Sequence, residues 1–206
     1  GSGWGNGLTR VYDAVAMDYL YADVNNIMIM LGNHDMDRIA DVVKDQDPRR
    51  VKLANTLLAT MRGIPQVFYG DEYAMKSADR RMGHSTLRMP LPLGEAVTAE
   101  MQDMFDYQSR LFQWRKGEEV IHTGRTMHFM SRDNTYAFFR YNDNEAVFVF
   151  ANASEENRTI PTANYAEILS KYNPVGVDII SEETIDLSKK DLVATPLSAL
   201  IVKLGK

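Results

Sequence analysis

Three adjacent polar residues, Asn33-His34-Asp35, come one position after the apolar run Ile27–Leu31. Short apolar runs between polar residues are typical of strands buried on both faces. In α/β folds the ligand sites lie at the carboxyl ends of such strands, so these side chains could bind a ligand through hydrogen bonds. The same residue types also suit a simple turn, and the local pattern leaves both interpretations open.

The elements that position these residues alternate between helices and short strands as far as residue 118. Helical spacing, capping residues and apolar runs predict their order. We expect a helix over Leu8–Tyr19, the strand Ile27–Leu31, a helix capped by Asp47, the strand Ile64–Tyr69, and a long helix capped by Thr98. The polar and proline-rich stretch Lys76–Gly94 is expected to form no regular element.

After residue 118 the apolar pattern changes to a period of two, which predicts strands. The segments Tyr136–Tyr141 and Glu145–Asn152 are joined by Asn142-Asp143-Asn144, a hairpin signal. Further short runs predict strands at Val177–Ile180, Thr184–Leu187 and Ala199–Leu204. This part is therefore expected to be an all-β module, built from strands only and arranged as a sandwich.

Composition excludes several classes of protein. The 206 residues are 45% hydrophobic and 25% charged, as in globular proteins with a core. The net charge of −5 argues against a nucleic-acid partner, and no apolar run approaches the roughly 18 residues of a membrane span. There is no cysteine, so the compartment stays unknown. Gly1-Ser2-Gly3 suggests either an expression scar or a cut inside a longer chain.

Four motifs in sequence order resemble the α-amylase family of glycoside hydrolases, with the neopullulanase and cyclomaltodextrinase-like branch the most similar. Asn33-His34-Asp35 with Arg38 resembles the signature after the family's seventh barrel strand. The segment 63–72 is similar to its eighth strand and following loop, and the segment 113–116 to the end of the helix that leaves the barrel. The β-module lies where these enzymes carry a C-terminal sandwich.

The resemblance implies a fold of class α/β plus all-β. Residues 1–118 would be the last two βα units, with strands 7 and 8, of a (β/α)8 barrel, and residues 119–206 an antiparallel β-sandwich. The family's nucleophile and general acid belong to strands four and five, which have no counterpart in this sequence. The chain therefore resembles a fragment, and by itself it is expected to be inactive.

The resemblance also implies roles for single residues. Asp35 matches a carboxylate that binds sugar hydroxyls more tightly in the transition state, and His34 matches a neighbour that binds the same hydroxyls. Asn33 and Arg38 would hold the loop and pair with nearby carboxylates, while Glu72 would either line the cleft or shape the eighth loop. Without the resemblance, Asp35 would be read as a turn or cap residue and His34 as an ordinary hydrogen-bonded histidine.

One segment departs from the family pattern. After Leu87-Arg88 the family has an acidic residue where this chain has Pro90, which puts a substrate contact from the segment in doubt. No metal spacing joins His34, Asp35, Asp37 and His84, so no metal or other cofactor is expected in this chain, and calcium in a longer parent stays open.

Three functions remain in competition. The leading one is part of a retaining enzyme that acts on starch-like or cyclic α-glucans, with an α-glucan oligosaccharide as partner. The others are a non-catalytic carbohydrate-binding or structural module, and a parent that transfers glucosyl groups or builds a disaccharide. Exposed aromatic residues on the sandwich would favour binding, but Tyr136, Phe138 and Phe139 are expected to be core. Barrel strands without neighbours also predict a homo-oligomer.

Overall fold

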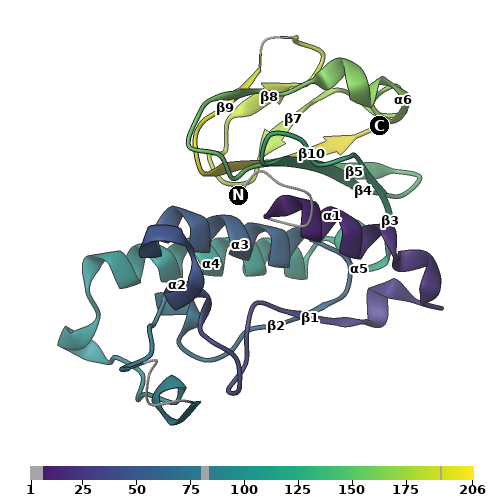
Figure 1. The fold of residues 1–206 in the computed structure, drawn as a ribbon. Helices are drawn as coiled ribbons and strands as arrows, with labels where there is room; N and C mark the ends of the chain where they lie inside the picture. Colours follow the sequence, from purple (N-terminus) through teal and green to yellow (C-terminus); the bar gives the residue numbers. More distant parts are fainter. Residues whose placement is uncertain (1–6, 80–83, 191) are drawn as a thin grey trace.

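The structure is a computed structural model that describes residues 7–79, 84–190 and 192–206. The chain forms three tiers: an antiparallel sheet, a layer of helices below it, and two short strands with long loops below the helices (Figure 1). Gly1–Gly3, interpreted as either an expression scar or a cut inside a longer chain, lie outside the described residues. Of the helices described, none is both long and apolar enough to cross a membrane.

The middle tier contains three helices, and two of them begin at the predicted caps. Asp47 accepts a hydrogen bond from the backbone N–H of Arg49, and Thr98 accepts one from that of Met101, so both helices begin where expected. The first helix ends earlier than predicted, and Tyr19 is 77% exposed beyond its end. The helices are α1 (Leu8–Ala16), α3 (Pro48–Thr60) and α4 (Ala99–Lys116), with the short α2 (Ile39–Val42) beside them.

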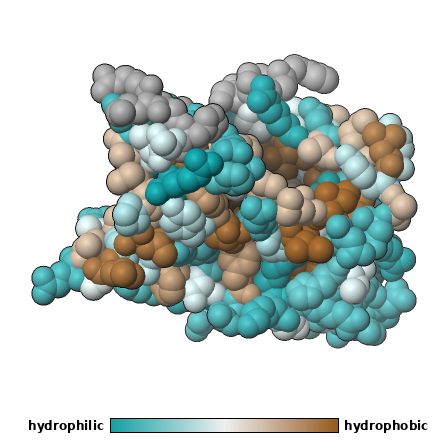
Figure 2. All heavy atoms as spheres, turned by 90° about the horizontal axis from the view of Figure 1, so that it is seen from below, coloured by the Kyte–Doolittle hydropathy of each residue, from teal (hydrophilic) through white to brown (hydrophobic). Residues whose placement is uncertain are grey.

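The two predicted N-terminal strands form a parallel pair, but each is only three residues long. They are β1 (Met28–Met30) and β2 (Ile64–Gln66). The expectation that the first strand is buried on both faces is wrong, because Met28 in β1 is 56% exposed; in β2, Ile64 is 55% exposed. Within the described residues each strand pairs with the other alone, which leaves one edge of each without a partner strand. Seen from below, hydrophobic residues interrupt the hydrophilic surface (Figure 2).

The upper tier is a six-stranded antiparallel sheet in the order β3-β4-β5-β10-β7-β8. The predicted hairpin is confirmed: the side-chain oxygen of Asn142 accepts hydrogen bonds from the backbone N–H groups of Asn144 and Glu145. The strands are β3 (Arg125–His128), β4 (Thr135–Tyr141), β5 (Glu145–Asn152), β7 (Val175–Asp178), β8 (Thr184–Asp186) and β10 (Ser198–Gly205).

Both faces of the central strands are buried, which explains their aromatic and valine content. Phe139 and Phe148 lie on the face that packs against Tyr165 and Ile168. The opposite face, which includes Phe138, packs against side chains of α1, α3 and α4. The helical layer and the sheet therefore share one hydrophobic core. Because the sheet aromatics are core residues, as predicted, they do not form an exposed sugar-binding row.

The C-terminal part is not made of strands only. It also contains the helices α5 (Glu119–Thr123) and α6 (Ala166–Leu169), and a small separate ladder formed by β6 (Arg158–Thr159) and β9 (Val193–Ala194). The outer face of the large sheet is thus covered by this ladder together with α6 and the turn before it. The coarse prediction, an α/β part followed by an antiparallel sheet domain, is confirmed.

Candidate functional site

The polar cluster after β1 forms a turn that leaves two of its side chains exposed. The side-chain oxygen of Asn33 accepts a hydrogen bond of 2.8 Å from the backbone N–H of Asp35, and its carbonyl accepts one from Met36. Such a side-chain-to-backbone bond closes a turn in place of a backbone bond. The side chains of His34 and Asp35 are 58% and 62% exposed. The turn therefore presents an imidazole and a carboxylate to solvent at the carboxyl end of β1.

The Asp35 carboxylate is flanked by two basic side chains. His34 Nε2 lies 3.1 Å from Asp35 Oδ2, and Arg88 Nη2 donates to Asp35 Oδ1 over 3.1 Å. An ionised carboxylate offers about four lone-pair sites, so these two neighbours leave room for further donors. A sugar hydroxyl is a donor of this kind.

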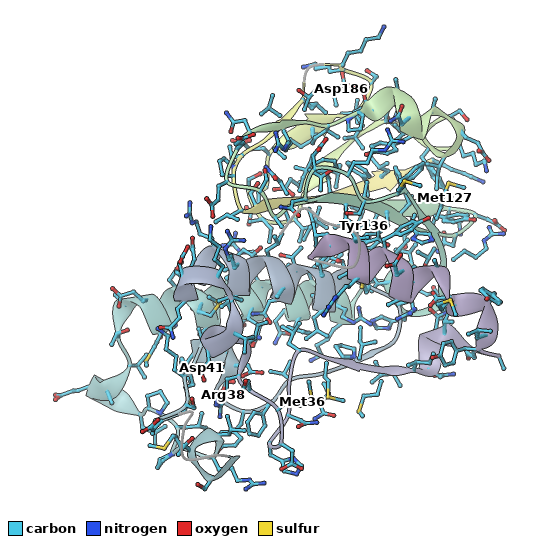
Figure 3. All side chains as sticks on the ribbon, viewed as in Figure 1. Met36, Arg38, Asp41, Met127, Tyr136 and Asp186 are labelled. Atoms are coloured by element: carbon cyan, nitrogen blue, oxygen red, sulfur yellow. The ribbon has the colours of Figure 1, made fainter. Side chains whose placement is uncertain are left out.

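Arg38 is the buried centre of the site loops. Its guanidinium donates to the carbonyl of Leu87 through Nε and Nη2, at 3.1 and 2.8 Å. Its Nη1 donates to the carbonyl of Tyr69 at 2.9 Å and to Asp71 Oδ1 at 3.1 Å, and the guanidinium also stacks over the ring of Phe68. Arg38 thus ties together the loop after β1, the loop after β2 and the segment around Leu87. Figure 3 shows Arg38 and Met36 in the lower part of the molecule, away from the antiparallel sheet.

The carboxyl groups of the loop after β2 are engaged in holding that loop. Asp71, in the short helical turn η4 (Asp71–Tyr73), is buried beside Arg38. Burial raises the pKa of Asp71 to about 6, although the guanidinium of Arg38 acts in the opposite direction. Glu72 Oε2 accepts a hydrogen bond of 2.7 Å from the backbone N–H of Gly70, which is the geometry of a loop-shaping residue.

Gly70 is required by this packing. Its backbone adopts φ = +88°, a conformation that residues with a side chain rarely adopt. A Cβ atom there would collide with the sulfur of Met75 and lie 3.1 Å from Arg38 Nη1. The glycine therefore allows the loop to pass close to the buried guanidinium.

Sequence reasoning missed Arg88 as a member of the site. It treated the segment around Pro90 only as a departure from the family pattern, yet the structure places Arg88 against Asp35. The sequence offers only a weak signal for Arg88, because it is an arginine beside an apolar residue in a loop without periodicity. The stretch Lys76–Gly94 was expected to be irregular. Its described residues include a helical turn, η6 (His84–Leu87), and residues 80–83 lie outside the description.

Two further histidines, His122 and His128, make hydrogen-bond contacts within the fold. His122 Nε2 lies 2.8 Å from the carbonyl oxygen of Arg115, and His128 Nδ1 lies 3.1 Å from the hydroxyl of Tyr136. Across residues 7–79, 84–190 and 192–206, no group of three or more acidic, histidine or cysteine side chains is arranged to hold a metal ion. What the site can offer chemically is one exposed carboxylate between two basic groups.

Comparison with known proteins gives matches to both regions of the chain. Residues 126–203 match the family model of the cyclomaltodextrinase C-terminal domain. A 4-α-glucanotransferase from Thermotoga maritima is 27% identical over 150 residues, which is 60% of this chain and 34% of the relative. An α-amylase from Niallia circulans is 26% identical over 172 residues, which is 80% of this chain and 30% of the relative.

The fold also matches solved structures. An α-amylase from Geobacillus thermoleovorans, complexed with acarbose, superposes with a TM-score of 0.73 at 19% identity, over 95% of this chain and 43% of that one. The chain thus spans about a third of the length of the curated relatives and under half of this structure. The order of its motifs and these matches agree: the chain is similar to members of the α-amylase family in both of its regions.

Proposed function

We propose that this chain is the C-terminal part of a retaining glycoside hydrolase that acts on α-glucosidic bonds of starch-like or cyclic α-glucans. The observation that carries the proposal is the exposed Asp35 with His34 beside it, at the carboxyl end of β1 and in the loop that Arg38 ties to the loop after β2. In barrel enzymes the active site lies at this end of the strands. The sequence similarity to an α-amylase supports the substrate class.

In this proposal, β1 and β2 are the last two strands of a (β/α)8 barrel, and the domain boundary falls near residue 118. The parallel pairing of β1 with β2 and the helices between them support the barrel assignment. The start of the antiparallel sheet at Arg125 supports the boundary. Both strands would gain neighbours from the remaining barrel strands.

The proposed roles follow from the geometry of each side chain. Asp35 accepts hydrogen bonds from sugar hydroxyls beside the anomeric carbon, and His34 donates to the same hydroxyls. These bonds shorten as the ring flattens, so they stabilise the transition state more than the bound substrate. Asn33 closes the turn, Arg38 holds the loops together, and Glu72 shapes the loop after β2.

The chain alone is expected to be inactive. Retaining glycosidases need a nucleophile and a general acid about 5 to 5.5 Å apart. In this proposal both belong to preceding barrel strands, and Asp35 cannot serve as both. Purified chain should therefore release no reducing sugar from maltooligosaccharides.

A parent enzyme that transfers glucosyl groups is the second candidate. The observation that favours it is the similarity to proteins named 4-α-glucanotransferase and cyclomaltodextrin glucanotransferase. The proposed role of Asp35 is the same for either reaction, because both begin with attack on the anomeric carbon. The products formed from a single maltooligosaccharide distinguish them, since a transferase lengthens some chains while it shortens others.

The proposal is tested by Asp35→Asn in the longer enzyme that carries this chain. The kcat should fall by about 10²- to 10³-fold, the scale for loss of one transition-state contact, while KM changes less. Asp143→Asn is the matched control, because Asp143 is also exposed and paired with an arginine, but it lies in the hairpin of the sheet. A kcat within a few-fold of wild type for Asp35→Asn would reduce Asp35 to a turn residue.

We further propose that the open strands drive association when the chain is isolated. Met28 and Ile64 are more than half exposed, and an unpaired strand edge can pair with another chain. A two-fold dimer is the simplest arrangement that covers them. Light scattering at micromolar concentration should give about twice the monomer mass. A monomer with strong amide-exchange protection at β1 would overturn this proposal.

A further inference from the structure

The segment that carries Arg88 is fixed on both sides of that residue. On one side, the carbonyl of Leu87 accepts two hydrogen bonds from Arg38, whose side chain is fully buried. On the other side, the carbonyl of Met89 accepts a hydrogen bond of 3.0 Å from the hydroxyl of Tyr69. The backbone at Arg88 is therefore held by groups that belong to the loops after β1 and β2.

This arrangement distinguishes Arg88 from an ordinary surface arginine. An exposed ion pair normally forms at the expense of side-chain freedom in two flexible partners. Here the backbones of both partners are already restrained, because Asp35 lies in the turn closed by Asn33 and Arg88 lies between two anchored carbonyls. The side chains are 49% and 62% exposed, so the pair also stays open to a ligand.

Each oxygen of the Asp35 carboxylate contacts a different neighbour. Arg88 Nη2 donates to Oδ1, and His34 Nε2 lies beside Oδ2. A carboxylate held at both oxygens cannot rotate freely about its side-chain bonds. Its remaining lone pairs then point in fixed directions, which is what a transition-state contact requires.

We propose that Arg88 is a positioning residue for Asp35, holding its carboxylate in the orientation in which it receives sugar hydroxyls. Arg38 sets the position of Arg88 through the carbonyl of Leu87. The inference rests on the proposed function for its effect on catalysis, but the restraint on Asp35 is a property of this chain alone. The segment that departs from the family pattern at Pro90 thus still serves the site through Arg88.

The first test uses the 206-residue chain and does not depend on activity. Three-bond NMR couplings report the χ1 rotamer of Asp35 in the wild type, Arg88→Gln and Arg88→Lys. We expect one dominant rotamer in the wild type, averaged couplings in Arg88→Gln, and partial recovery in Arg88→Lys, which keeps the charge but not the planar fork. Arg125→Gln is the matched control, because it removes an exposed arginine paired with Asp143 over 2.9 Å in the sheet.

The second test measures the same variants in the longer enzyme. Arg88→Gln should lower kcat by about 10- to 100-fold with little change in KM, since a misplaced catalytic contact costs on this scale. Arg88→Lys should recover part of the loss, and Arg125→Gln should match the wild type. In an Asp35→Asn background, Arg88→Gln should have almost no further effect, because its target is gone.

The outcomes separate this inference from the proposed function. Unchanged Asp35 couplings in Arg88→Gln overturn the inference, whatever the enzyme does. The inference is also overturned if the kcat of the double variant falls by the full product of the two single-variant losses, because Arg88 would then act independently of Asp35. A longer enzyme without activity on α-glucans would refute the proposed function, while the couplings would still decide whether Arg88 orients Asp35.

Discussion

The site loops and the antiparallel sheet each contain a fully buried arginine, and the two arginines have different surroundings. Arg38, in the loops, pairs with the carboxylate of Asp71 as well as with backbone carbonyls. Arg140, in β4, donates to three neutral oxygens, from Thr126, Asn25 and Ile121, and burial lowers its pKa to about 10. One arginine organises loops, and the other ties the sheet to the segment before β1.

The difference reflects what holds each region together. The sheet is stabilised by apolar burial on both faces, so Arg140 adds a tether to a region that already has a core. Around Asp35 there is little apolar burial, and the loops depend on hydrogen bonds to Arg38. Polar restraint of this kind fixes loop geometry while leaving His34 and Asp35 in contact with solvent. Side chains that bind a substrate need this exposure, whereas side chains in a hydrophobic core are shielded from solvent.

The largest effect expected from this comparison is the loss of unfolding free energy when a cavity is made in the sheet. The ring of Phe148 is fully buried, with the rings of Phe139 and Tyr165 at centroid distances of 4.8 and 5.3 Å. Phe148→Ala should lower the free energy of unfolding by about 3–5 kcal/mol in urea titrations. Met28→Ala, at an exposed position in β1, should change it by less than about 0.5 kcal/mol. Similar losses for both variants would show that β1 belongs to the same stabilising core.

The same contrast explains which elements could be predicted from sequence. In the sheet, alternation and turn chemistry come from local residues, so the strand Glu145–Asn152 was predicted with the correct bounds, and its partner in the hairpin with a start one residue too late. The caps Asp47 and Thr98 are also local signals. The run Ile27–Leu31 predicted a longer strand than β1, because strand length depends on pairing partners as well as on residue type.

The site was predictable only in part, for a related reason. The exposed pair His34 and Asp35 could be found because the motif is contiguous in sequence. Arg88 lies 53 residues from Asp35, and it is held there by hydrogen bonds from Arg38 to the carbonyl of Leu87 and from Tyr69 to the carbonyl of Met89. The two-residue strands β6 and β9 were missed as well, since such short pairings leave no periodicity to read.

A smaller effect is the pH dependence of stability, which is expected to have opposite signs in the two regions. The pKa of Asp71 is raised by burial to about 6, so the folded state binds a proton between about pH 4 and 6 that the unfolded state has released. The stability contributed by this group is present below pH 4 and is lost as pH rises through 6. Asp186, in β8 in the upper part of Figure 3, has its pKa lowered by hydrogen bonds from Ser188, and its contribution is lost as pH falls.

Asp71→Asn and Asp186→Asn test these signs, because an asparagine of similar shape does not titrate. From pH 4 to pH 7, the unfolding free energy of the wild type should fall relative to Asp71→Asn by up to ~3 kcal/mol, the equivalent of a shift of about two pKa units. Relative to Asp186→Asn it should rise slightly, since Asp186 is exposed and its interactions are screened by solvent. Urea titrations at intervals of half a pH unit measure both differences. A flat difference for Asp71→Asn would mean that Arg38 keeps Asp71 ionised throughout, and that charge pairing rather than burial governs the loops around the site.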